Sequence, residues 1–414
     1  MVSARKTPRE KSEIDLKMLA DKIKGPESRE LRLKVFRGVF SYRPLNLFLM
    51  NQSSALFSGR RILLTACVVF SAGFFSAVQA ESVDPDDEAI RYVGRFTEDY
   101  RFAWTGAEIE TLFQGSTIAA DLQVVAAPPA GLTVVVDGEP HFLKIGPGRG
   151  TYTLAEGLDP NEVHRISVVK RSEGARGTVK FYGFELPDGG ELMRPDAPDR
   201  RILVIGDSIT CGYGNEASDP KEGNTVENEN GYMSYALIAA RELDADAMLI
   251  CWSGRGMYRN RGKNNDQKGT LPMLFDQTLP FDGEIEWDHS RFVPDVIVIN
   301  LGTNDSAELN GAKPPLPKEG FVETYTEFLK RLREMAPDSV LILSIGPMQS
   351  GPVAGWLPEI AEEFDNASVL IYSKFQGKED IGGHWHPSVL KDQKMAQQLV
   401  EVIEASTGWT TGSN

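Results

Sequence analysis

Four short polar segments in the second half of the chain each border an apolar run that could form a strand or a helix. These segments are GDSIT at 206–210, SGRGMY at 253–258, GTND at 302–305 and GHWHPS at 383–388. The first contains Ser208 and the last contains His386. A serine hydroxyl becomes a nucleophile when a neighbouring base takes its proton, and histidine titrates near neutrality. A lone serine after a strand is usually just a helix cap, so the segments are informative only as a set.

The runs between these segments have the lengths and periods of strands and helices. Strand-like runs lie at 201–205, 247–252, 296–301 and 340–345, and helix-like runs at 232–243, 321–335 and 389–403. The alternation predicts an α/β fold, a parallel sheet with helices on both faces. In such sheets ligands bind at the carboxyl ends of the strands, so we expect the polar segments to meet at that edge. One helical face should carry Phe321, Tyr325, Phe328, Leu329 and Leu332.

Residues 88–186 have a different hydrophobic pattern, in which runs of alternating apolar residues are separated by turn residues and no helical period is present. This pattern predicts an all-β unit of about 100 residues, a β-sandwich. The composition of residues 187–200 (PDGGELMRPDAPDR) is that of a linker. We therefore expect an N-terminal extension with a signal peptide over 1–80, a sandwich over 81–190 and the α/β domain over 199–410.

The motif GDSITCGYGN at 206–215, together with the preceding β-domain, resembles carbohydrate esterase family 2 of the SGNH (GDSL) hydrolase superfamily, whose members include acetyl xylan esterases. Members pair a jelly-roll domain with an SGNH domain, and the resemblance covers roughly residues 88–410. The elbow G-x-S-x-G of α/β-hydrolases is absent, which argues against that fold.

The resemblance implies a role for each motif residue. Ser208 would be the nucleophile and His386 the base, while the backbone N–H of Ser208, Gly254 and the Asn304 amide would hold the oxyanion. Glycine suits position 254, because a side chain would obstruct the ester. The alternative for His386 is a surface histidine near a helix start. Asp207 and Asp305, two further acidic residues of the motifs, are expected to fix loops.

The acid that usually orients the base has no match here. Superfamily members carry it three residues before the base, where this chain has Gly383, or two before, where it has His384. Asp380 is the nearest carboxylate in sequence, but its spacing fits neither pattern. We expect a Ser–His dyad whose imidazole is oriented by a main-chain carbonyl, an arrangement that the resemblance allows.

Two aromatic residues are candidates for substrate binding. Trp385 adjoins His386, and Tyr258 follows the second polar segment's glycines; matching aromatics line the sugar site in the family. The alternative for each ring is packing. Cys211 and Cys251 also lie close to the motifs, where they could form a disulfide or remain buried thiols.

Composition excludes several classes of protein. The net charge of −15 would repel phosphate backbones, so nucleic-acid binding is not expected. Three cysteines without a CxxC pattern exclude a zinc ribbon, an iron–sulfur cluster and a disulfide scaffold.

An apolar run at 62–77 predicts export. Arg60 and Arg61 precede it, and the small residues Val78 and Ala80 suit cleavage after residue 80. The alternative is an uncleaved anchor, although 16 residues are short for a membrane span of about 20. The basic residues 1–49 are consistent with a start codon assigned too early. We expect a periplasmic or secreted protein with no stable membrane insertion after cleavage.

These features together predict an exported enzyme that removes acetyl groups from a polysaccharide or oligosaccharide. The expected partner is an acetylated carbohydrate, and neither a cofactor nor a metal is required. A lipid or thioester esterase of the SGNH type is one alternative. A non-catalytic carbohydrate-binding protein is the other.

Overall fold

The computed structural model describes residues 80–126, 129–262, 266–280, 282–307 and 314–412. The predicted signal peptide at 62–77 and the basic segment 1–49 lie outside these residues. None of the helices in the described part of the chain has the length and apolar content needed to span a bilayer.

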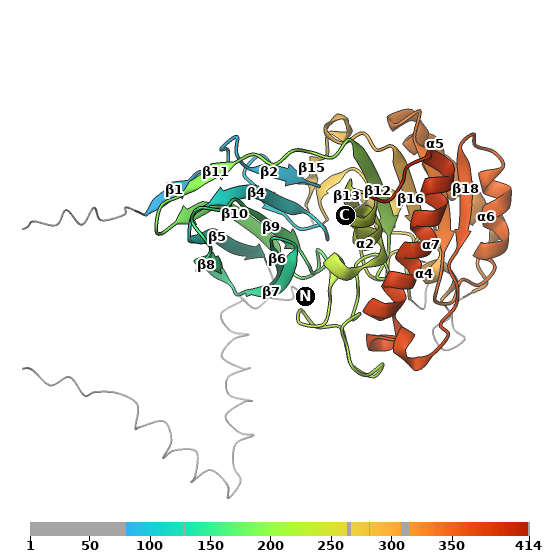
Figure 1. Cartoon of the computed structure of the whole chain (residues 1–414). Helices are drawn as coiled ribbons and strands as arrows, with labels where there is room; N and C mark the ends of the chain where they lie inside the picture. Colours follow the sequence, from blue (N-terminus) through green and yellow to red (C-terminus); the bar gives the residue numbers. More distant parts are fainter. Residues whose placement is uncertain (1–79, 127–128, 263–265, 281, 308–313, 413–414) are drawn as a thin grey trace, which may run out of the picture. The chain divides into compact units, whose positions relative to one another are not determined.

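Two antiparallel sheets form the first half of the described chain, coloured blue to green in Figure 1. One sheet contains β1 (Glu81–Val83), β3 (Arg101–Phe102), β5 (Thr117–Ala126), β8 (Gly148–Glu156) and β10 (Thr178–Leu186). The other contains β2 (Arg91–Val93), β4 (Glu108–Gln114), β6 (Ala130–Val136), β7 (Glu139–Ile145), β9 (His164–Lys170) and β11 (Glu191–Met193). Their inward side chains form one apolar core, which includes Leu122, Val168 and Phe181. The all-β prediction is confirmed.

The segment read as a linker contains a strand. Residues 191–193 form β11, in which Met193 pairs with Leu112 of β4. The next strand, β12, begins at Arg200. Three residues are too few for a hydrophobic period to reveal such an edge strand in sequence.

A parallel sheet forms the second half, in the order β13-β12-β16-β17-β18. Its strands are β12 (Arg200–Gly206), β13 (Ala245–Cys251), β16 (Val296–Asn300), β17 (Val340–Ile345) and β18 (Ala367–Ile371). The longer helices are α2 (Tyr235–Glu242), α5 (Lys318–Met335), α6 (Val353–Ala361) and α7 (Val389–Thr407). Shorter elements are α3 (Leu271–Leu274), α4 (Thr303–Ser306), η1 (Gly231–Met233), η2 (His289–Arg291), η3 (Lys378–Asp380), η4 (Gly383–Trp385) and the ribbon β14 (Gln277–Leu279) with β15 (Asp282–Glu286).

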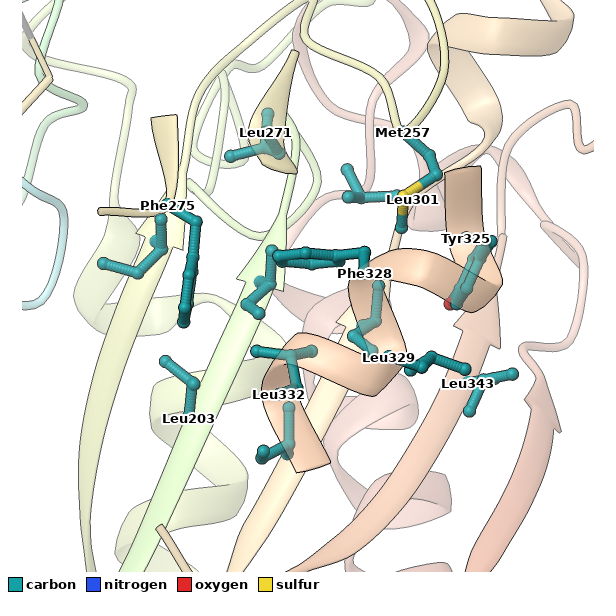
Figure 2. Packing of buried hydrophobic residues seen from close by; sticks show 14 of the residues in the cluster. Leu203, Met257, Leu271, Phe275, Leu301, Tyr325, Phe328, Leu329, Leu332 and Leu343 are labelled. Carbon is teal, nitrogen blue, oxygen red and sulfur yellow. The ribbon is translucent and has the colours of Figure 1, made fainter. Parts of the chain in front are cut away.

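Helices cover both faces of this sheet, as predicted. Alternate strand residues such as Leu203 and Leu343 pack with α5 and α6 on one face, and the intervening residues pack with α2 and α7 on the other. Figure 2 shows Phe328, Leu329 and Leu332 of α5 over the first face. The predicted apolar face of this helix is fully buried.

The strand order decides where a site can form. Strand β12 has β13 on one side and β16 on the other. The strand that follows β12 in the chain therefore lies on one side of it, and the later strands are added on the other side. Loops that leave the carboxyl ends of these three strands diverge there and open a crevice. Ser208 and Gly254 lie in the segments after β12 and β13, and Asn304 lies in the short helix α4, which begins three residues after β16 ends.

Candidate active site

Ser208 and His386 meet at this edge of the sheet. Ser208 Oγ lies 2.8 Å from His386 Nε2, and the two residues are only 6% and 5% exposed. Ser208 is in the turn after β12, and His386 precedes the first residues of α7. The turn closes tightly, since a side chain at Gly206 would meet Thr210 Oγ1 at 1.9 Å.

The backbone before His386 orients its ring. His384 (φ 49°) and Trp385 (φ 59°) both adopt the left-handed conformation, which costs free energy in non-glycine residues. The resulting turn brings the His384 carbonyl oxygen to 3.2 Å from His386 Nδ1. A carbonyl only accepts hydrogen bonds, so the proton must be on Nδ1 and Nε2 is left to accept from the Ser208 hydroxyl.

Asp380 lies elsewhere. Its buried carboxylate accepts hydrogen bonds from Lys394 Nζ at 2.6 Å and from the Gln376 N–H at 2.8 Å. Within the described residues no hydrogen bond joins this carboxylate to His386. The group that orients the imidazole in this structure is therefore the His384 carbonyl, the arrangement expected of a dyad.

Burial controls the charge of the imidazole. The pKa of His386 is lowered to about 4, mainly by burial; the His384 carbonyl acts to raise the pKa, and the Arg261 charge acts to lower it. Neutral imidazole is the form that can accept a proton from serine. His386 is thus in its basic form at neutral pH.

Two backbone N–H groups are available beside the serine. Those of Ser208 and Gly254 make no hydrogen bond to any described residue. Gly254 has φ +81°, and a Cβ there would have only Arg261 Cβ, at 3.9 Å, within 4 Å. This positive φ favours glycine at position 254. The sequence suggested a different reason, that a side chain there would obstruct the ester.

Asn304 connects the two turns. Its Nδ2 donates to Asp207 Oδ2 at 2.9 Å and to the Arg255 carbonyl at 2.8 Å, next to Ser208 and Gly254 respectively. Both protons of this nitrogen are therefore engaged in the structure. Burial raises the pKa of Asp207, the first of these partners, to about 7.

Asp305 fixes the loop after β13, as expected. Its carboxylate accepts the backbone N–H groups of Met257, Tyr258 and Arg259 at 3.0, 2.7 and 2.9 Å. The Met257 side chain of the same loop is buried in the core beside Leu301, as Figure 2 shows.

The two candidate aromatic residues differ in placement. Trp385 is 56% exposed beside the Ser208–His386 pair. Tyr258 packs partly buried against the core, and its ring lies so close to Gly320 of α5 that a Cβ there would meet it at 2.9 Å. Trp385 is thus free to contact a ligand, whereas Tyr258 has a packing partner.

Sequence reasoning missed Tyr213. Its ring lies 4.3 Å from the His386 ring between centroids, and its hydroxyl is 3.0 Å from His384 Nδ1. The signal was present in the GDSITCGYGN motif, but nothing local connects that tyrosine to a histidine far along the chain.

Cys211 and Cys251 are buried free thiols in the structure, with sulfur atoms 2.7 Å apart. Within the described ranges, no group of three or more His, Cys, Asp or Glu side chains is arranged to hold a metal ion.

Family models match both halves of the chain. The model described as "Carbohydrate esterase 2 N-terminal" matches residues 92–195, and that of the "GDSL-like Lipase/Acylhydrolase family" matches residues 204–378.

Curated relatives extend the match. The chain is 33% identical over 350 residues to the cellulase/esterase CelE of Acetivibrio thermocellus. The matched region is 80% of this chain and 41% of CelE. It thus spans less than half the length of that relative. It is 29% identical over 318 residues to an acetylxylan esterase/glucomannan deacetylase of Cellvibrio japonicus, covering 74% of this chain and 85% of the relative.

Solved structures share the whole described architecture. A family two carbohydrate esterase from Clostridium thermocellum, in complex with cellohexaose, matches with a TM-score of 0.72 and 32% identity over 77% of this chain and 99% of that one. A family two carbohydrate esterase from Cellvibrio japonicus matches with a TM-score of 0.70 and 26% identity, over 80% and 99% of the two chains. With this pairing of a β-sandwich and a GDSL-type domain, the chain belongs to carbohydrate esterase family 2.

Proposed function

We propose that this protein is an exported carbohydrate esterase that removes acetyl groups from a polysaccharide or oligosaccharide by Ser–His catalysis. The observation that carries the proposal is the 2.8 Å approach of His386 Nε2 to Ser208 Oγ, with Nδ1 turned to a carbonyl. Family membership and the names of the relatives support the carbohydrate ester as substrate. Export rests on the apolar run at 62–77.

In the proposed reaction, Ser208 Oγ attacks the acetyl carbonyl carbon while its proton passes to His386 Nε2. The carbonyl electron pair moves to oxygen, and the N–H groups of Ser208 and Gly254 stabilise the charge. Asn304 would be the third donor, when the oxyanion replaces one of its two present acceptors.

The tetrahedral intermediate then collapses, and the sugar oxygen leaves with the proton from His386. Water, deprotonated by His386, then attacks the carbonyl carbon of the acetyl-enzyme. The bond from this carbon to Ser208 Oγ breaks, acetate is released as acetic acid, and the proton on His386 Nε2 returns to Ser208 Oγ. The His384 carbonyl keeps the imidazole in the required tautomer, but it stabilises the imidazolium less than a carboxylate would.

The test is acetate release from a panel of acetylated glycans by the wild type and by Ser208→Ala. We expect the variant to fold normally and to lose activity by about 10⁴-fold or more, as when a serine nucleophile is removed elsewhere. Asn304→Ala should lower kcat by about 10²–10³-fold, the usual loss for one oxyanion donor.

The rival functions give different results in the same panel. Preference for long-acyl nitrophenyl esters over acetyl esters would indicate a lipid or thioester esterase. Glycan retention without acetate release would indicate a binding protein.

A further inference from the structure

The turn between β9 and β10 reaches from the sandwich to the parallel-sheet domain. The Arg171 carbonyl accepts the Gly231 N–H at 2.8 Å, and Arg171 Nε donates to the Glu229 carbonyl at 2.9 Å. Arg176 donates to the Asn224 carbonyl at 2.6 Å. These are contacts to backbone atoms, so they fix the position of the turn closely.

Glu173, at the centre of this turn, contacts the loop after β13. Its Oε2 accepts the Ser253 N–H at 2.8 Å, although Glu173 and Ser253 belong to different domains. The Glu173 N–H in turn donates to Glu229 Oε1 at 3.1 Å. Glu173 is 5% exposed and Glu229 is fully buried.

The turn that carries Glu173 is held rigidly. The buried Lys170 ammonium donates to the Ser172 carbonyl at 2.6 Å, to Ser172 Oγ at 3.0 Å and to the Glu173 carbonyl at 3.3 Å. Ser172 Oγ accepts the Gly131 N–H at 3.0 Å. The backbone around Glu173 is therefore fixed, while burial and the bond to Ser253 restrict its side chain.

These contacts fix the peptide that carries the Gly254 N–H. Glu173 holds the N–H of residue 253, and the Arg261 N–H donates to the Gly254 carbonyl at 2.8 Å. The N–H of Gly254 lies between these two points and has no partner among the described residues. A donor that must face an oxyanion needs this kind of preorganisation.

We propose that Glu173 of the sandwich is a positioning residue for ester hydrolysis, which holds the Ser253–Gly254 peptide so that the Gly254 N–H faces the oxyanion. This inference rests on the proposed function. It makes the sandwich a part of the catalytic apparatus, acting through a hydrogen bond and without touching the acetyl group.

The test compares Glu173→Ala, Glu173→Met and Glu173→Gln in the full chain, with kcat and KM measured on a small aryl acetate. Alanine and methionine lack the acceptor, and methionine keeps much of the volume. Both should lower kcat by about 10- to 100-fold with KM changed less than about threefold, the scale expected when a catalytic group is displaced by a fraction of an ångström to 1 Å. Glutamine keeps an acceptor oxygen and should stay within about threefold of the wild-type kcat.

Asp246→Asn is the matched control. Asp246 lies at the opposite end of β13 and forms a partly buried ion pair with Arg91 of the sandwich, so it joins the same two domains away from the site. This variant should lower the melting temperature and leave kcat unchanged. Hydrogen–deuterium exchange supplies a readout independent of activity, because the Ser253 amide should exchange faster in Glu173→Ala and not in Asp246→Asn.

Three results would overturn the inference: an unchanged kcat in Glu173→Ala, a glutamine variant as impaired as alanine, or unchanged exchange at Ser253. If Glu173→Ala fails to fold, the methionine and glutamine variants carry the comparison. A wild type inactive on aryl and glycan acetates would instead contradict the proposed function, and this inference with it.

Discussion

The imidazole of His386 is buried next to Ser208, and no carboxylate of the described residues forms a hydrogen bond with it. A carbonyl fixes its tautomer, and burial together with Arg261 disfavours the imidazolium. In a triad the carboxylate would fix the same tautomer and would also stabilise the imidazolium. These features of His386 predict a particular pH dependence of activity.

The acid limb of the pH–activity profile should lie near pH 4. His386 acts when neutral, and because burial lowers its pKa to about 4, activity should be lost only as the pH falls through that value. The test is to measure kcat/KM from initial rates on an aryl acetate between pH 3.5 and 8. Tryptophan fluorescence at each pH serves as the control for folding. An acid limb near 6.5, the ordinary histidine value, would show that the imidazole is not buried as described.

Trp385 should determine preference for sugars. Trp385 is 56% exposed next to Ser208 and His386, where its indole can pack on the C–H face of a sugar ring. Trp385→Ala should weaken kcat/KM on an acetylated oligosaccharide more than on an aryl acetate, which has no sugar ring. The difference should be on the order of 1–3 kcal/mol, as for one buried apolar contact.

Equal losses on the two substrates would mean that Trp385 only shapes the turn before His386. Tyr258→Ala is a useful comparison, because the packing of Tyr258 against Gly320 leads us to expect a loss of stability without a change of substrate preference.

At the scale of elements, the segment from η3 to the start of α7 must hold His386 although it contains little regular structure. Ser388 caps α7 by accepting the Lys391 N–H, and Ile381 forms a bridge with Pro387. Asp380 joins the segment to α7 through Lys394, and the Asp380 carbonyl accepts the Ser388 N–H at 2.9 Å. The carboxylate thus stabilises the segment that carries His386.

Asp380→Asn should therefore change stability more than catalysis. We expect kcat to fall less than about tenfold, and the free energy of unfolding to fall by about 1–3 kcal/mol for the weakened bonds to a charged group. Urea denaturation and aryl acetate kinetics on the same preparation separate the two effects. A loss of kcat approaching 10⁴, the scale of a neutralised triad acid, would show that Asp380 orients His386 during the reaction.

At the scale of the whole molecule, several carboxyl groups from different elements are buried. Asp207 lies in the turn after β12, Glu229 lies against the sandwich, and Asp392 lies on α7, and all three are fully buried. Burial raises the pKa of Asp207 to about 7 and that of Asp392 to about 8, and it also raises that of Glu229. Folding therefore favours their protonated forms.

Stability should decrease between pH 6.5 and 8. A carboxyl whose folded pKa exceeds its unfolded value of about 4 contributes stability that is lost as the pH rises through the folded pKa. His386 opposes this trend in the lower part of the window, because it is neutral in the folded protein while the unfolded histidine still loses its proton around the ordinary pKa of about 6.5; this single group is outweighed by the three carboxyls. The effect of Lys170, whose pKa burial lowers to about 8, comes mainly above the window. Chemical denaturation at pH 6.5, 7.25 and 8 measures the slope. Asp392→Asn should reduce that slope, and a flat wild-type curve would contradict the assignment of protonated buried carboxyls.

Local patterns in the sequence determined the class of fold and the members of the site. The period of apolar residues gave the strands, the helices and the buried face of α5, because each depends only on neighbours along the chain. The parallel alternation then placed Ser208, Gly254 and Asn304 at one edge, since the carboxyl ends of adjacent parallel strands meet there. Short edge strands such as β11 could not be predicted, because three residues are too few to show a hydrophobic period.

Tertiary structure alone decided how the site works. The His384 carbonyl orients the His386 imidazole only because His384 and Trp385 adopt left-handed conformations that their residue types do not favour. Tyr213 reaches His386, and Glu173 reaches Ser253, across segments far apart in sequence. Such contacts depend on how folded elements dock and on the direction of individual hydrogen bonds. Neither is encoded in the spacing of residues along the chain.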